Sequence, residues 1–177
     1  MGGVRTRPQQ PSPSAGAPRL ASPADAGHVG RLLDDFNREF GEPTPGPEWL
    51  AARTAELLAE GDTAVLLAGP GPDAVAVVRL RKALWSDALE CYLAELYVAP
   101  AMRGRGLGRA LLAAAIDHAR ATGAAYMELG TGEQDVAARG LYESFGFSNR
   151  EGGPGGPINY YYELELATSP KGHIHGA

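Results

Sequence analysis

A glycine-rich loop near the middle of the chain constrains the fold more than any other feature. It consists of Arg103, Gly104, Arg105, Gly106, Leu107 and Gly108. The segment before it alternates from Cys91 to Val98 and ends at Pro100, because proline cannot donate a hydrogen bond to a strand ladder. The segment after it, 107–122, has the composition of a helix and is closed by Gly123. The sequence therefore predicts a strand, a tight loop and a helix in direct succession.

The same loop has the features of an anion site. Glycine has no Cβ, so main-chain N–H groups can approach a ligand closely. These N–H groups lie at a predicted helix N-terminus, where the partial positive charge favours anions. The side chains of Arg103, Arg105 and Arg109 add full positive charge. We interpret this stretch as a cradle for a pyrophosphate group; a solvated basic turn is the alternative.

Length and composition restrict the remaining possibilities. The 177 residues, 44% of them hydrophobic, suffice for one ordinary domain with a sizeable core. A net charge of −5 argues against nucleic-acid binding, which needs a basic surface. No apolar run approaches the roughly 20 residues that span a bilayer, and no secretory signal is recognisable, so we expect no membrane partner. The single cysteine, Cys91, fits a reducing cytoplasm, and the body of the chain has no metal-ligand spacing.

Changes in hydrophobic period divide the chain into elements. We expect a disordered tail at 1–18, one domain at 19–166 and a second tail at 167–177. Within the domain the order is helices at 22–40 and 47–61, strands at 63–68, 73–84 and 91–98, a helix at 107–122, a strand at 124–129, a helix at 135–145, and closing strands at 147–150 and 159–166. This order predicts an α+β fold with a mixed sheet and helices on its faces, in which the crossover around the loop is parallel and right-handed.

Two common nucleotide-binding motifs do not match the loop. The P-loop needs a Lys-Ser or Lys-Thr pair that is absent, and the Rossmann fingerprint would need glycine where Arg109 stands. What remains is Arg103-x-x-Gly106-x-Gly108 at the start of a helix. This spacing resembles the acyl-CoA loop of the GNAT superfamily of N-acyltransferases.

The resemblance extends beyond the loop. Leu96-Tyr97-Val98 is similar to the family's strand that lies along pantetheine, and Ala138-x-x-Leu141-Tyr142-x-x-x-Gly146-Phe147 resembles its second signature helix. The order of elements over 19–166 also fits the family. The resemblance implies a three-layer α/β/α fold, with a mostly antiparallel mixed sheet and a parallel strand–helix–strand unit that binds CoA.

The implied reaction is transfer of the acetyl group of acetyl-CoA to a primary amine, without a metal. One departure is Asp135, where the family often has Asn; Asp can cap a helix but cannot donate an amide hydrogen bond to the cofactor. The residues implied to bind the cofactor are Leu96, Tyr97, Val98, Arg103, Gly104, Arg105, Gly106, Leu107, Gly108, Arg109, Asp135, Ala138 and Tyr142.

Two residues are expected to move protons. Tyr142 occupies the family's tyrosine position beside the thioester sulfur and can supply a proton as a neutral phenol. The alternative for Tyr142 is a core aromatic, since it shares an apolar helix face with Leu141 and Phe145. Glu95 is expected to be the base or to bind the amine.

The expected position of Glu95 follows from the period of its strand. A period of two places Glu95 on one face with Cys91, Leu93 and Tyr97. A carboxylate among apolar residues is costly unless it is paired or wet, which suggests a lined cavity. The alternative is an ion pair with a basic residue of the neighbouring strand, Arg79 or Arg81.

The acceptor is less well defined by the sequence. Residues 25–62 hold nine acidic side chains and three arginines, which favours a small cationic amine such as a polyamine or amino sugar. An ordinary solvated helix face would give the same composition. A lysine or N-terminal protein acetyltransferase, and a non-catalytic acyl-CoA sensor, remain alternatives. We expect a small-molecule amine as the partner and leave a homodimer open.

Overall fold

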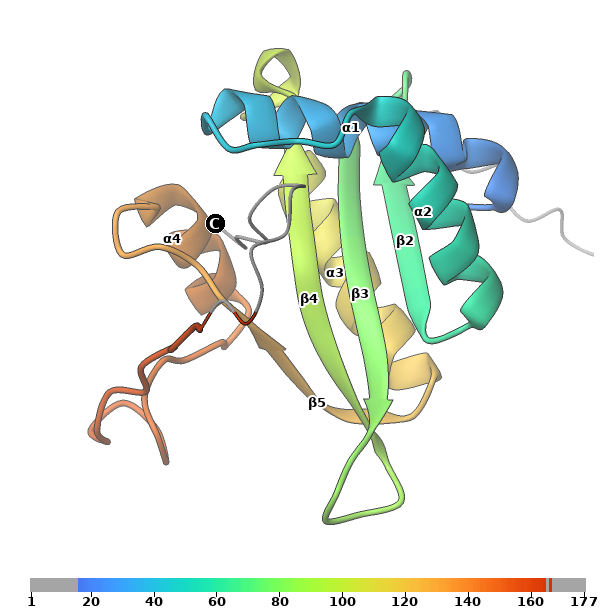
Figure 1. Ribbon diagram of the computed structural model, residues 1–177. Helices are drawn as coiled ribbons and strands as arrows, with labels where there is room; N and C mark the ends of the chain where they lie inside the picture. Colours follow the sequence, from blue (N-terminus) through green and yellow to red (C-terminus); the bar gives the residue numbers. More distant parts are fainter. Residues whose placement is uncertain (1–15, 165, 167–177) are drawn as a thin grey trace, which may run out of the picture.

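The computed structural model describes residues 16–164 and residue 166. Of the tails expected at 1–18 and 167–177, residues 1–15 and 167–177 lie outside the described residues. Within that range the chain forms a five-stranded sheet whose strands follow one another in chain order (Figure 1). The strands are β1 (Arg19–Leu20), β2 (Thr63–Ala68), β3 (Ala74–Lys82), β4 (Leu89–Val98) and β5 (Ala124–Leu129).

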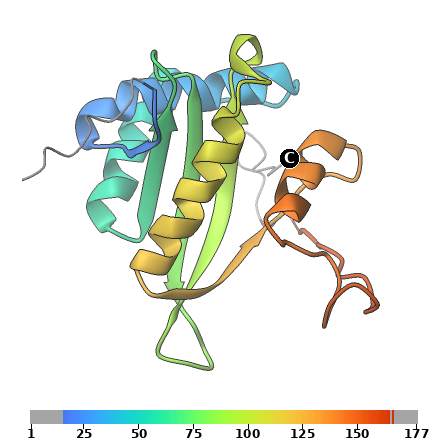
Figure 2. The ribbon, with the colours of Figure 1, turned by 180° about the vertical axis from the view of Figure 1, so that it is seen from behind.

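The direction of the strands confirms the predicted mixed sheet. β4 and β5 are parallel, and the other neighbouring pairs are antiparallel. The helix α3 (Leu107–Ala121) joins β4 to β5 and covers one face of the sheet, as Figure 2 shows from behind. The α+β class and the parallel strand–helix–strand unit are therefore as predicted. β1 was not predicted; it adds two residues to the edge of the sheet.

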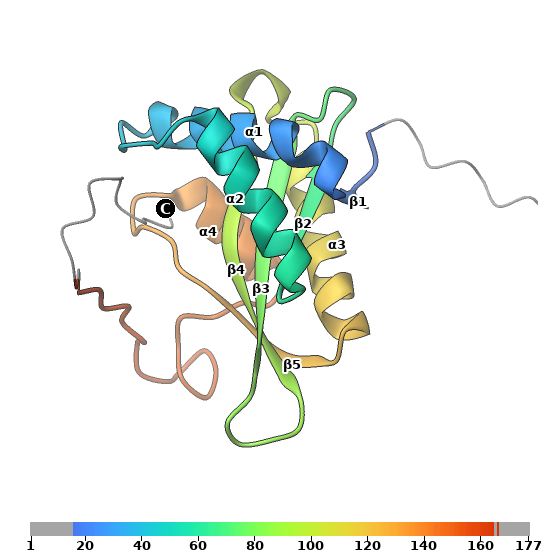
Figure 3. The same cartoon turned by 45° about the vertical axis from the view of Figure 1, so that its right-hand side comes forward.

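Three further helices complete the layers. The helices α1 (Ala26–Glu39) and α2 (Pro47–Glu60) cover the opposite face from α3 (Figures 1 and 3). The helix α4 (Val136–Ser144) lies beside β4. Short 3-10 turns at Pro23–Asp25 and Pro100–Met102 precede α1 and the glycine loop. No helix in the described part of the chain is long and apolar enough to cross a membrane.

The sheet separates two apolar clusters. On one side Val29, Leu32 and Phe36 of α1 pack against side chains of β2 and β3 and against Tyr97 of β4. On the other side Leu111 and the other buried residues of α3 pack against the opposite faces of β2, β3 and β4. Strands covered on both faces have continuous apolar sequences, which explains the unbroken run of buried residues in β2 and β3.

A bulge in β4 corrects the predicted orientation of Glu95. The register pairs Val77 with Glu95 and Val78 with Leu93, so one extra residue of β4, Ala94, lies between the two pairs. Such an insertion shifts the alternation of side chains. Leu93 consequently belongs to the α3 cluster, as does Cys91, whereas Glu95 lies opposite Val77 of the α1 cluster. The prediction that Glu95 shares a face with Cys91 and Leu93 is wrong, while its shared face with Tyr97 is confirmed.

The two closing strands predicted at 147–150 and 159–166 are also wrong for the residues that the structure describes. This region has a single isolated bridge, between Arg150 and Ile158. The connecting turn is held by bonds such as Glu151 N–H to the carbonyl of Pro157, and no ladder extends from it. The alternating segment that begins at Asn159 does not pack on the sheet in the described structure, and Tyr162 is 85% exposed. Position 165 of the predicted strand lies outside the described residues.

Candidate active site

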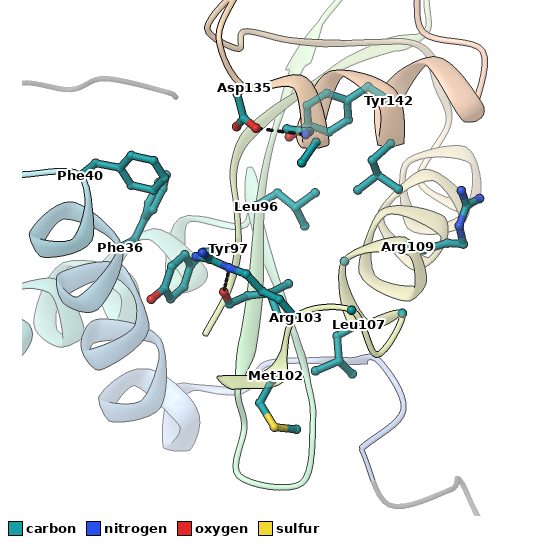
Figure 4. A pocket seen from close by; sticks show the side chains of 17 residues that line it. Phe36, Phe40, Leu96, Tyr97, Met102, Arg103, Leu107, Arg109, Asp135 and Tyr142 are labelled. Carbon is teal, nitrogen blue, oxygen red and sulfur yellow. Dashed lines mark hydrogen bonds between the residues drawn. The ribbon is translucent and has the colours of Figure 1, made fainter. Parts of the chain in front are cut away.

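A cavity of about 400 Å³ opens where the end of β4, the glycine loop, the start of α3 and the helix α4 meet (Figure 4). It gathers all of the predicted site residues except Glu95 and Arg105. Those that line it are Leu96, Tyr97, Val98, Arg103, Gly104, Gly106, Leu107, Gly108, Arg109, Asp135, Ala138 and Tyr142. Residues distant in sequence therefore meet around one cavity.

The cavity also has a wall that the sequence reasoning did not assign to the site. Phe36 and Phe40 of α1 line it, together with Met102. The rings of Phe36 and Phe40 stand edge to face with centroids 5.2 Å apart, and Phe36 is also 5.2 Å from the ring of Tyr97. Their spacing in the sequence identified only an apolar helix face. The position of α1 over the end of β4 is tertiary information, and no local signal carries it.

The loop geometry explains its glycines. Gly104 and Gly106 have φ angles of 73° and 81°, a left-handed conformation that residues with a Cβ rarely adopt. Gly106 directly precedes the first residue of α3, so the helix N-terminus opens at the cavity. A Cβ on Gly108 would lie 3.5 Å from Val98 and 3.7 Å from Leu141, so glycine leaves space between β4 and α4. The loop can thus present main-chain N–H groups to an anion.

The three arginines of the loop have different surroundings. The Arg103 guanidinium forms an ion pair with Glu39 of α1 at 2.7 Å. Arg109 donates a hydrogen bond of 3.0 Å to Ser144 Oγ and lies over the ring of Phe145. Arg105 is exposed and, among the described residues, forms no hydrogen bond or ion pair. Arg105 therefore has the guanidinium most available to a ligand, although it lies outside the cavity lining.

Helix α4 positions the predicted acid. Asp135 caps the helix by accepting a hydrogen bond of 3.1 Å from the N–H of Ala138, as expected for Asp at this position. Tyr142, two turns later, is only 7% exposed and packs against Phe147 with ring centroids 6.0 Å apart. It belongs to the apolar core and also lines the cavity. Both expectations for Tyr142 are thus compatible with its position.

Burial changes the proton affinity of both candidate residues. It raises the pKa of Tyr142 to about 12, with the charges of Asp135 and Glu95 adding to the effect. The phenol therefore stays protonated at neutral pH. Burial likewise raises the pKa of Glu95 to about 7. Since the charge of Glu95 acts on Tyr142, the two groups lie within electrostatic reach, although Glu95 is outside the cavity lining.

The ion pair considered for Glu95 is not present in the described structure. Arg81 instead binds Glu90 at 2.7 Å and Glu128 at 2.8 Å. Among the described residues the side chain of Glu95 forms no hydrogen bond or ion pair, and neither does that of Arg79. A buried carboxyl without a partner is costly in its charged form, which is the physical cause of the raised pKa of Glu95. Such a group can take up and release a proton near neutral pH.

Comparison with known proteins agrees with this geometry. Residues 30–147 match the model of the Acetyltransferase (GNAT) family. The chain is 28% identical to the uncharacterized N-acetyltransferase YhfO of Bacillus subtilis over 136 residues, covering 76% of this chain and 91% of that protein. It is 39% identical to mycothiol acetyltransferase of Beutenbergia cavernae over 72 residues, 39% of this chain. The chain spans about a quarter of the length of two of the curated relatives it matches, 25% and 24%.

A solved structure extends the likeness to the whole fold. A protein from Arthrobacter sp. FB24 has 45% sequence identity and a TM-score of 0.78, and the match covers 88% of this chain and 100% of that one. The family match, over residues 30–147, includes the glycine loop and α4. The chain therefore belongs to the GNAT acetyltransferase family.

Proposed function

We propose that this protein transfers the acetyl group of acetyl-CoA to a primary amine of a small molecule. The observation that carries the proposal is that one cavity is lined both by the glycine loop at the N-terminus of α3 and by the buried phenol of Tyr142. An anion site alone would fit many ligands. In one cavity with the phenol of Tyr142, and with a carboxyl of pKa about 7 within electrostatic reach of that phenol, the loop fits a donor that has both a pyrophosphate and a reactive thioester.

The described residues fit the donor. Main-chain N–H groups of the loop and the start of α3 would hold the pyrophosphate, assisted by Arg105 and Arg109. The strand β4 offers a second set of main-chain groups, because β5 pairs with it only as far as Leu93. Beyond that point, residues Leu96 to Val98 are paired only on the side of β3. The amide groups of pantetheine would bind there in the manner of an added strand.

The two titratable residues would serve the chemistry as follows. Acetyl-CoA supplies an acyl group activated as a thioester. A primary amine has a pKa of about 10 and must lose a proton before its nitrogen can attack. Ionised Glu95 would accept that proton, directly or through water. Tyr142 would donate its phenolic proton to the departing sulfur as the C–S bond breaks. The acylated nitrogen would then give its second proton to the phenolate, which restores Tyr142, and Glu95 would release the first proton to solvent. The products are an N-acetyl amine and a free thiol.

The acidic character of α1 and α2 gives limited support to a cationic acceptor. Five of the nine carboxylates between residues 25 and 62 form ion pairs: Asp25, Asp34, Asp35, Glu39 and Glu56. Only Glu42, Glu48, Glu60 and Asp62 are left to attract a cation. We therefore propose a small primary amine as the acceptor class, with polyamines and amino sugars as the first compounds to test.

A thiol-release assay tests the proposal. The protein is mixed with acetyl-CoA and a panel of polyamines, amino sugars, amino acids and lysine peptides, and free CoA is measured with a thiol reagent. Acetylation of a small amine by the wild type and its loss in Tyr142→Phe is the expected result. Turnover of peptides alone would indicate protein acetylation. Tight donor binding without any turnover would favour a non-catalytic sensor.

A further inference from the structure

Helix α1 is joined to the glycine loop by a compact set of polar contacts. Glu39, the last residue of α1, has two contacts with Arg103. Nη2 donates a hydrogen bond of 2.8 Å to Oε2, and Nη1 lies in an ion pair 2.7 Å from Oε1. The Nε of Arg103 donates to the carbonyl of Val98 at 3.0 Å. Each nitrogen of the guanidinium thus has a contact within the protein, and the side facing Glu39 is occupied. An arginine that bound pyrophosphate through the same fork would have to give up these contacts.

Tyr97 completes the arrangement. Its hydroxyl donates to Glu39 Oε2 at 3.1 Å, and the Arg103 guanidinium lies 5.8 Å from the centre of its ring. The hydrogen bonds from Arg103 hold the pKa of the Glu39 carboxyl below its usual value. The carboxylate therefore remains charged and paired over the pH range in which most enzymes work.

These contacts determine where the aromatic wall of the cavity lies. Phe36 and Phe40 stand on the last turn of α1 and directly after it, on either side of Glu39. Phe36 packs on the ring of Tyr97, which Glu39 also holds. Figure 4 shows Arg103 and Tyr97 between this wall and the glycine loop. Loss of the Glu39 contacts would release the end of α1 from both β4 and the loop.

We propose that Glu39, Tyr97 and Arg103 form a clamp that fixes the end of α1 against the glycine loop, so that Arg103 is a positioning residue and not a phosphate ligand. Anion binding then depends on the main-chain N–H groups and on Arg105 and Arg109. The clamp holds the aromatic wall of Phe36 and Phe40 in place. The position of this wall in turn determines the shape of the cavity on the side of the acceptor. The inference rests on the proposed function only for this last consequence.

Two measurements test the clamp without requiring turnover. The first is calorimetric binding of ADP, a probe that carries a pyrophosphate and no acyl group. Arg105→Ala should weaken ADP binding about tenfold, the loss of one charge-assisted contact, whereas Arg103→Ala should leave the Kd within about twofold. The second is amide hydrogen exchange of residues 36–42, which should accelerate at least about fivefold in both Glu39→Ala and Arg103→Ala.

Glu42→Ala is the matched control, because it removes a carboxylate three residues away that forms no ion pair among the described residues. Its exchange rates should equal those of the wild type. Unchanged exchange in Glu39→Ala overturns the clamp, and weakening of ADP binding by Arg103→Ala to the same extent as by Arg105→Ala overturns the positioning role. If ADP does not bind the wild type at all, the proposed function fails, while the exchange rates still decide whether the clamp exists.

Discussion

Substitution of Glu95 by glutamine should change stability in a way that depends on pH. Burial raises the pKa of this carboxyl from 4.5 to about 7 in the folded protein. Between these two values the folded state holds a proton that the unfolded state has lost, so the free energy of unfolding of the wild type falls as pH rises. Glutamine does not ionise. The variant should therefore gain stability relative to the wild type from pH 4.5 to pH 7, by up to about 3 kcal/mol, and show a constant difference above pH 7.

The same titration should appear in the kinetics. With a pKa of about 7, about a tenth of Glu95 is ionised at pH 6 and about nine tenths at pH 8. The ratio of kcat/KM for wild type over Glu95→Gln should therefore rise about tenfold over this interval. The further rise caused by deprotonation of the amine is common to both proteins and cancels in the ratio.

Urea denaturation and thiol release, each measured at every half unit from pH 4.5 to pH 9, give the two curves. Glu90→Gln is the control, since it removes a carboxylate from the same strand that is paired with Arg81. Its kinetic ratio to wild type should not change with pH. A stability difference that is independent of pH would refute the raised pKa of Glu95. If the stability difference changed with pH while the ratio of kcat/KM values did not, Glu95 would be a buried structural group and not the base.

Four further substitutions test the site and its framework. Tyr142→Phe should lower kcat about 100-fold or more, and leave the Kd for acetyl-CoA within twofold or so. Stopped assays measure kcat and calorimetry measures the Kd. An unchanged kcat would remove Tyr142 from the mechanism. Gly30→Ala should destabilise the protein by about 1–3 kcal/mol, because its Cβ would collide with the carbonyl of Pro47 and lie 2.7 Å from the nitrogen of Ala51. In the same helix a Cβ added at Gly27 has no neighbouring atom within 4 Å, so Gly27→Ala should stabilise the protein by up to about 1 kcal/mol. If urea denaturation showed equal effects for Gly27→Ala and Gly30→Ala, close packing of α1 on α2 would be refuted. Gly106→Ala should weaken donor binding and cost about 1 kcal/mol, since its φ is 81°; wild-type affinity in this variant would mean that the loop tolerates another conformation.

The sequence was sufficient for features determined by local chemistry. Glycines, prolines and hydrophobic period define the helix boundaries closely, and the loop from Arg103 to Gly108 could be recognised because its function depends on main-chain conformation. The bulge at Ala94 could not be predicted, since it depends on the register between β3 and β4 and leaves no mark in composition. The ion pair of Arg103 with Glu39 was equally inaccessible, because the partner is 64 residues away in the chain.

The closing strands show the limit of period alone. The alternation after Asn159 is as regular as that of β4, but a strand also needs a neighbouring strand and a face to cover. In the described structure β5 is the last strand of the sheet, and the tyrosines after Asn159 remain exposed. An alternating pattern therefore predicts the strand propensity of a segment. Whether the segment forms a strand depends on whether the rest of the sheet offers a neighbouring strand and a face to cover.

The early departure of β5 from β4 has a consequence for the stability of the protein. β4 is paired with β3 from end to end except at the bulge residue Ala94, but its last five residues have no strand on the other side among the described residues (Figure 1). A ligand that occupies this side binds only the folded chain, so by mass action its concentration sets part of the folding free energy, about 2.7 kcal/mol at a hundred times Kd. The thermal midpoint should accordingly report the donor concentration in solution. Resistance to proteolysis would then follow the supply of donor, even when no acceptor is present.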